Sequence, residues 1–119
     1  MVLVDTSIWV SHFRDGDLQL EALLMNGRVI CHPFIVGELA CGDLKNRKEI
    51  LSLLQALPTA TTADHEEVLR FIERDHLMGI GLGYVDIHLL ASARLSGISL
   101  WTKDKKLIEA AEKLNISYK

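Results

Sequence analysis

The chain has 119 residues, of which 49% are hydrophobic, a size that fits one compact domain over residues 1–119. No apolar run approaches the roughly 20 residues that cross a bilayer, and no secretory signal peptide opens the chain, so we expect a cytoplasmic protein with no membrane partner. The formal net charge of −3 argues against a general nucleic-acid-binding protein, which would usually be basic, but allows an enzyme whose acids are balanced by bound metal.

The first predicted strand covers residues 2–4, an unbroken apolar run of the kind found in the middle of a parallel sheet. Asp5 stands where this strand ends, and either Thr6 or Ser7 is suited to cap a helix that begins at Ile8. Asp5 is therefore expected at the carboxyl edge of a central strand, where open α/β sheets bind ligands. For this residue taken alone, a simple role as a cap or turn residue stays open.

Short apolar strands and amphipathic helices alternate along the rest of the chain. Further strands are expected at residues 29–31, 98–101 and 116–118. Helices are expected at residues 8–13, 18–25, 33–40, 50–57, 65–76, 84–97 and 105–114. This alternation predicts an α/β fold, a three-layer α/β/α sandwich with a central parallel sheet.

The helix at residues 65–76 carries charges of both signs, typical of a solvated face with ion pairs four residues apart. These charged residues are Glu66, Glu67, Arg70, Glu73 and Arg74. We predict no chemistry on this face.

Two acids lie early in strongly apolar helices. Glu38 sits among the apolar residues 34–40, where an unpaired buried charge is costly, so we favour a site role over a place on the solvent side of the helix. Asp86 lies in the first turn of the helix at residues 84–97, which is apolar nearly all round and is expected to be central. The alternative for Asp86 is simple complementation of the helix dipole.

A fourth acid, Asp104, follows the strand at residues 98–101 and repeats the order strand, hydroxyl, acid, helix found around Asp5. If the strands are parallel, Asp5, Glu38, Asp86 and Asp104 can meet over one edge of the sheet. Two carboxylates about 4 Å apart repel by roughly 4 kcal/mol at an effective dielectric near 20, so four need a compensating cation or take up protons.

A site of oxygen ligands without cysteine or histidine suits Mg²⁺ or Mn²⁺ rather than zinc. Such an ion can make a bound water more acidic, so that the water attacks a phosphodiester in line with the leaving oxygen. Thr6, Ser7 and Thr102 are placed to hold the carboxylates or the waters. The two cysteines, Cys31 and Cys41, have no metal-binding spacing and are expected to be free thiols.

At these residues the chain resembles the PIN domain, and its size and spacing are most similar to the VapC-type toxins of toxin–antitoxin pairs. The resemblance rests on four motifs that follow in order: Asp5-Thr6-Ser7, the segment VGELA at residues 36–40, Asp86 with the segment LLASA at residues 89–93, and Thr102-Lys103-Asp104. It covers nearly the whole chain. One departure is Leu107, where an aromatic residue is frequent in the family.

The resemblance implies a parallel α/β/α sandwich and metal-dependent endoribonuclease activity. It implies an acidic site made of Asp5, Glu38, Asp86 and Asp104. Thr6 or Ser7, together with Thr102, would assist this site. It also implies a homodimer, and inhibition by a cognate antitoxin that lays a segment across the active groove.

Two other functions stay open. The first is a catalytically silent PIN-fold interaction module. The second is a Mg²⁺-binding receiver-like phosphoacceptor domain, which is disfavoured because residues 50–62 contain no aspartate for the acceptor position. Seven basic residues could contact RNA phosphates, although ordinary surface solvation is favoured for most of them: Arg14, Lys45, Arg47, Lys48, Lys103, Lys105 and Lys106. The five histidines lack ligand spacing relative to one another and are expected to be structural or exposed.

Overall fold

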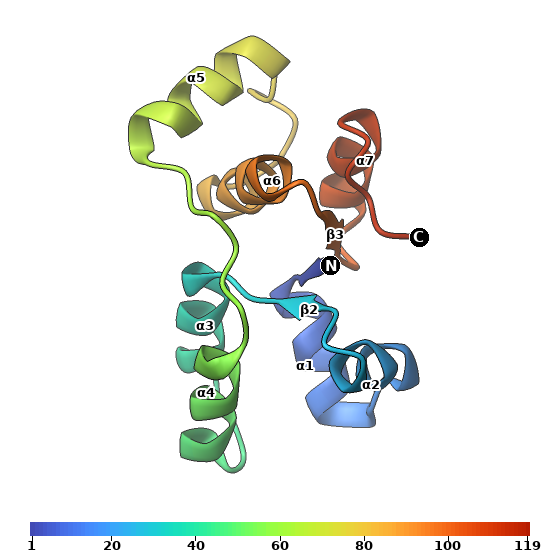
Figure 1. Cartoon of the computed structure of the whole chain (residues 1–119). Coiled ribbons are helices and arrows are strands. Elements are labelled where there is room, and N and C mark those ends of the chain that lie inside the picture. Colours follow the sequence, from blue (N-terminus) through green and yellow to red (C-terminus); the bar gives the residue numbers. More distant parts are fainter.

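A computed structural model describes residues 1–119 as three strands surrounded by seven helices (Figure 1). The strands are β1 (Val2–Val4), β2 (Val29–Ile30) and β3 (Ser99–Trp101). The helices are α1 (Thr6–Asp15), α2 (Leu18–Met25), α3 (Pro33–Ala40), α4 (Arg47–Ala56), α5 (His65–Asp75), α6 (Tyr84–Ser96) and α7 (Lys105–Lys113). In Figure 1, α5, α6 and α7 lie in the upper part of the view, and α1 to α4 lie in the lower part.

The three strands form one parallel sheet in the order β2-β1-β3, which confirms the expected α/β fold class. β1 lies in the middle, and its Val4 is in register with Trp101 of β3. The backbone N–H of Asp5 then donates to the carbonyl of Trp101 at 2.9 Å. Because parallel strands end at the same edge, Asp5 and Thr102 leave the sheet beside each other.

The core is one cluster of 24 buried apolar residues that joins the sheet to the helices around it. α6 is the most buried helix, with every residue from Ile87 to Ala93 inside, as its apolar sequence predicts. Asp86 therefore lies in the first turn of a helix that tertiary packing holds in place. None of the seven helices has the length and apolar character that a bilayer crossing requires.

Two predicted strands are shorter in the structure. Residues 116–118 form no strand, and Ser117 makes only an isolated parallel bridge to Leu100 of β3. β2 ends at Ile30, and Cys31 makes an isolated bridge to Thr59. Both segments flank the sheet on its outer edges, where a single pair of hydrogen bonds satisfies the backbone without continuing the ladder.

The predicted ion pairs four residues apart on α5 are also absent. Arg74 instead pairs with its neighbour Asp75, at 3.1 Å. Glu67 accepts from the backbone N–H of Asp64, whose side chain in turn accepts from the backbone N–H of Glu67. This capping box uses one carboxylate oxygen of Glu67 to begin the helix, and the other oxygen makes no ion pair.

Candidate active site at the carboxyl edge of the sheet

Asp5 is held at the end of β1 by two hydroxyl groups. Its side chain is 7% exposed, and its Oδ2 accepts from the Oγ1 of Thr102 at 2.7 Å and from the Oγ of Ser7 at 2.9 Å. The prediction that Thr6 or Ser7 caps a helix beginning at Ile8 is wrong, because α1 begins at Thr6 with Asp5 in the cap position. Both hydroxyls make hydrogen bonds to acidic side chains instead.

Thr102 connects Asp5 to the next acid along the edge. Its Oγ1 donates to Asp5 and accepts from the backbone N–H of Asp104 at 3.1 Å. Asp104 is exposed and caps α7, since its Oδ1 accepts from the backbone N–H groups of Lys106 and Leu107 at 3.0 and 3.3 Å. The repeated order strand, hydroxyl, acid, helix thus places both acids at the start of a helix.

Glu38 reaches the same edge from α3. Its Oε1 accepts from the Oγ1 of Thr6 at 2.7 Å, and Thr6 directly follows Asp5. The side chain is exposed, so the expectation that it turns away from solvent is wrong. The physical reason is that a carboxylate at the rim of the site keeps its hydration while it still contacts α1, which costs less than full burial.

Asp86 stands at the start of α6, and its Oδ2 accepts from the backbone N–H of Gly83 at 3.1 Å. Burial raises the pKa of Asp86, and the negative charges of Asp5 and Asp104 raise it further, against the opposing hydrogen bond from Gly83. Asp86 is therefore close enough to both Asp5 and Asp104 to be affected by their charges. Glu38 is connected to them through Thr6.

The four carboxylates share one arrangement, in which a single oxygen of each accepts protein hydrogen bonds and the second oxygen accepts none. No three His, Cys, Asp or Glu side chains stand close enough together to enclose a metal ion. Mg²⁺ seldom needs such a cage, because it binds through one or two carboxylates and keeps several waters. The fixed carboxylates with one oxygen free therefore fit a hydrated divalent cation.

The sequence did not indicate that aromatic and histidine side chains lie near the acids. Phe34 lies one helical turn before Glu38, and its ring contacts that of His88 on α6 with centroids 4.8 Å apart. Tyr84, two residues before Asp86, contacts His88 at 4.5 Å. An aromatic residue two or four positions before a candidate acid in the same helix is the signal that points to them. His88 is buried, as expected for a structural histidine.

Comparison with known proteins places this geometry in a family. The model of the PIN domain matches residues 2–113 of the chain. The protein "Ribonuclease VapC32", from Mycobacterium tuberculosis strains CDC 1551 and H37Rv, is 43% identical over 118 residues, which cover 98% of this chain and 95% of the relative. The family match spans nearly the whole chain, including all four acids, and the chain therefore belongs to the PIN-domain family.

Proposed function

We propose that this protein is a divalent-cation-dependent endoribonuclease of the VapC type, which hydrolyses RNA phosphodiester bonds as the toxin of a toxin–antitoxin pair. The observation that carries the proposal is the shared arrangement of Asp5, Glu38, Asp86 and Asp104, each held by one oxygen with the other left free. The relative named "Ribonuclease VapC32" supports RNA as the substrate. A single domain over residues 1–119 and a homodimer belong to the same proposal.

The four acids would hold Mg²⁺ or Mn²⁺, which when bound makes a coordinated water more acidic and offsets charge on the phosphate. Ser7 and Thr102 fix the orientation of Asp5, and Thr6 fixes that of Glu38. Asp86 is held by the backbone N–H of Gly83 through one oxygen, and its other oxygen would be available to the cation or to the attacking water. One carboxylate oxygen of Asp104 accepts backbone hydrogen bonds from α7, and the other would be available to the cation.

Asp5→Asn and Asp86→Asn test this assignment. Each change keeps the side-chain shape and the hydrogen-bond acceptor but removes the negative charge, so we expect RNA cleavage in Mg²⁺ to fall at least about a hundredfold. Circular dichroism spectra should match the unaltered protein. Asp43→Asn, in an exposed loop without a hydrogen bond to its side chain, is the matched control and should cleave normally.

Cleavage at the unaltered rate by both variants would overturn the assignment. A different result, in which the unaltered protein cleaves no RNA in Mg²⁺ or Mn²⁺, would favour the silent interaction module. Sequencing the 5′ ends of RNAs produced on induction in cells then identifies which RNA is cut.

For the antitoxin, we propose the apolar hollow of about 290 Å³ between α1, α2 and α4 as the docking surface. Seven of its eight lining residues are hydrophobic, and Leu53 is 62% exposed at its rim. An apolar face of an antitoxin helix would bury this surface. Because α1 also carries Thr6 and Ser7, a segment bound there can continue across the acids.

Leu53→Glu should weaken antitoxin binding, because it places a charge against the apolar face of the bound segment. RNA cleavage by the free protein should be unchanged, since Leu53 lines the apolar hollow, which contains none of the four acids. The measurement is inhibition of cleavage by titrated antitoxin. Equal inhibition of the Leu53→Glu variant and the unaltered protein would place the antitoxin elsewhere.

A further inference from the structure

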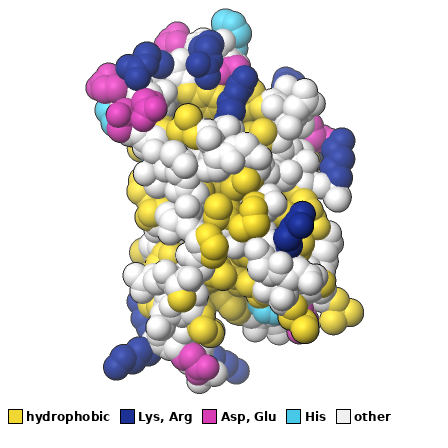
Figure 2. Space-filling model, in the orientation of Figure 1, with side chains coloured by type: hydrophobic (Ala, Val, Ile, Leu, Met, Phe, Trp, Pro, Cys, Tyr) yellow, Lys and Arg dark blue, Asp and Glu magenta, His cyan; other side chains and the backbone are white.

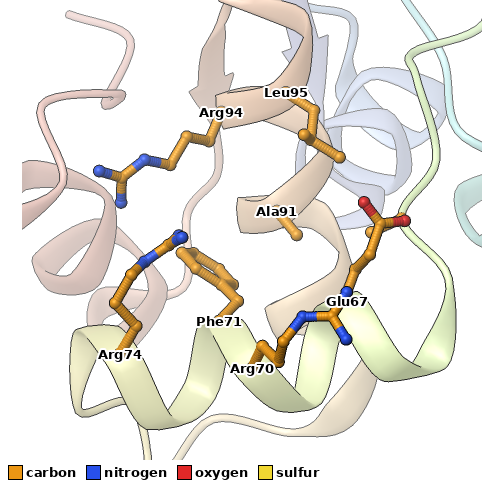
Figure 3. Close-up of a pocket in the computed structure, with 8 residues that line it drawn as sticks. Glu67, Arg70, Phe71, Arg74, Ala91, Arg94 and Leu95 are labelled. Atoms are coloured by element: carbon orange, nitrogen blue, oxygen red, sulfur yellow. The ribbon is translucent and has the colours of Figure 1, made fainter.

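A second concave site lies between α5 and α6, and it contains none of the four candidate acids of the sheet edge. The pocket has a volume of about 390 Å³. Figure 3 shows its side chains coming from two helices, with Arg70, Phe71 and Arg74 on α5 and Arg94 on α6. In the space-filling view, charged side chains gather over α5 at the top of the molecule, and hydrophobic atoms are visible beneath them (Figure 2).

The spacing of residues along the two helices creates this pocket. Glu67, Arg70 and Arg74 follow one another at three and four residues, so they share one face of α5. Ala91 lies opposite on α6, and its small side chain leaves space between the helices. What the sequence shows as the solvated face of a helix is therefore one wall of a hollow.

The pocket is positive in a protein that is negative overall. Three arginines and one glutamate line it, whereas the formal charge of the whole chain is −3. Asp75 stands beside the pocket and pairs with Arg74 at 3.1 Å and with Arg94 at 3.2 Å. Both arginines are about half exposed or more, so these pairs contribute little and can be exchanged for a ligand. Arg70 makes no ion pair.

The aromatic floor of the pocket positions two of the arginines. The guanidinium carbons of Arg74 and Arg94 lie 5.8 and 6.0 Å from the ring centroid of Phe71, which is 4% exposed. In Figure 3 the guanidinium ends of both side chains lie on the same side of the ring. Cation–π attraction thus helps to hold the guanidinium groups of Arg74 and Arg94 near each other despite their like charges. The third arginine, Arg70, is available to bind a ligand.

We propose that this pocket binds a phosphate monoester carried on a larger body with a planar aromatic ring, such as a nucleoside monophosphate. The guanidinium fork matches the geometry of phosphate oxygens. A monoester brings nearly two negative charges and three terminal oxygens, so it can accept hydrogen bonds from more than one guanidinium group at once and can compete with Asp75 for Arg74 and Arg94. The volume exceeds that of a phosphate group alone, and Ala63, Ala91 and Leu95 offer apolar contact to the rest of the ligand.

Calorimetric titration of the full chain with adenosine 5′-monophosphate tests the proposal. The buffer contains a chelator, so that no divalent cation can bring the nucleotide to the acidic site. We expect saturable binding of the nucleotide, weaker binding of inorganic phosphate, and still weaker binding of the phosphodiester ApA. Arg70→Gln and Arg94→Gln should each weaken nucleotide binding about tenfold or more.

Arg14→Gln is the matched control, because Arg14 pairs with its neighbour Asp15 as Arg74 does with Asp75 but lies on α1, outside the pocket. It should bind the nucleotide within about twofold of the unaltered protein. RNA cleavage by Arg70→Gln in Mg²⁺ should stay normal, which separates this pocket from the proposed nuclease site. It also reports that the variant is folded.

Three outcomes would overturn the proposal. The first is no saturable heat with the nucleotide or with phosphate at millimolar concentrations. The second is equal nucleotide affinity of Arg70→Gln, Arg94→Gln and the unaltered protein. The third is tighter binding of ApA than of the monophosphate, which would assign the pocket to the backbone of an RNA strand instead of a monoester.

Discussion

His32 shows how one buried side chain makes stability depend on pH. It is 1% exposed, and its Nδ1 accepts from the backbone N–H of Phe34 at 3.0 Å, which caps α3. Burial, and to a lesser extent the positive charge of His88, lowers the pKa of His32 from 6.5 to about 4. The folded protein therefore keeps this imidazole neutral under conditions in which the unfolded chain protonates it.

We expect the free energy of unfolding to be highest above pH 6.5 and to fall as the pH decreases toward 4. Across this window the unfolded state binds a proton at His32 that the folded state does not, which removes on the order of 3 kcal/mol. Urea titrations at several pH values measure the loss. Lowering of the pKa of His88, mainly by burial, acts in the same direction.

His32→Asn is the control for this effect, because asparagine keeps an acceptor at the cap of α3 but does not titrate. The variant should show a shallower loss of stability between pH 6.5 and 4 than the unaltered protein. An identical slope for the two proteins would mean that another group is responsible.

Residues of the site differ in how well the sequence alone identifies them. Asp5 and Asp104 follow apolar strands, and that signal predicts both positions correctly. Glu38 was expected to avoid solvent, and it is exposed because contact with Thr6 needs a side chain at the rim. The hydroxyls at residues 6 and 7 look like helix caps, and only the folded chain brings them acidic partners from other elements.

At the scale of elements, Asp104 combines a structural and a proposed functional role. Its Oδ1 caps α7, while its Oδ2 accepts no protein hydrogen bond. Asp104→Ala should lower the free energy of unfolding by about 1 kcal/mol, because it removes the cap. Asp104→Asn keeps an acceptor and should cost much less.

Both variants should lose RNA cleavage, since both remove the carboxylate charge. Thermal melts and cleavage rates of the two proteins, measured together, separate the roles. If Asp104→Asn cleaved RNA normally while Asp104→Ala did not, the cap alone would explain the need for this residue, and its place in the acidic site would be wrong.

The elements of the fold follow from local sequence wherever burial and local propensity agree. Helices such as α5 and α7 begin at a capping acid and carry an apolar stripe, and both were predicted within a few residues of their bounds. Residues 116–118 were predicted as a strand but make only one bridge. Strand pairing depends on the neighbouring strand, and the apolar pattern of these three residues cannot specify that neighbour. The α5–α6 pocket escaped prediction for the same reason, since its second wall comes from another helix.

At the scale of the whole molecule, the negative charge of Asp86 opposes folding unless a cation is bound, because burial and the neighbouring acids raise the pKa of Asp86. If Mg²⁺ binds the folded protein and not the unfolded chain, as the proposed function requires, millimolar Mg²⁺ should raise the melting temperature by several degrees. A ligand at one hundred times its Kd adds about 2.7 kcal/mol. In the presence of a chelator, Asp86→Asn should be at least as stable as the unaltered protein. The raised pKa of Asp86 means that its ionised carboxylate is less favourable in the folded protein than in the unfolded chain.

Differential scanning calorimetry with and without Mg²⁺ makes this comparison. Asp86→Asn should gain less from Mg²⁺ than the unaltered protein, whereas Asp43→Asn should gain the same. Equal gains for all three proteins would show that the cation acts elsewhere on the surface.

The middle position of β1 has a consequence for the order of events during synthesis. This strand is the first to leave the ribosome, yet one of its two neighbours, β3, is encoded nearly a hundred residues later. Pairing between segments so distant in sequence is slow and comes late in folding. A nascent chain therefore carries Asp5 without Thr102 to hold it until β3 has been made, and the edge of the sheet that bears the acids forms only after that strand has paired with β1.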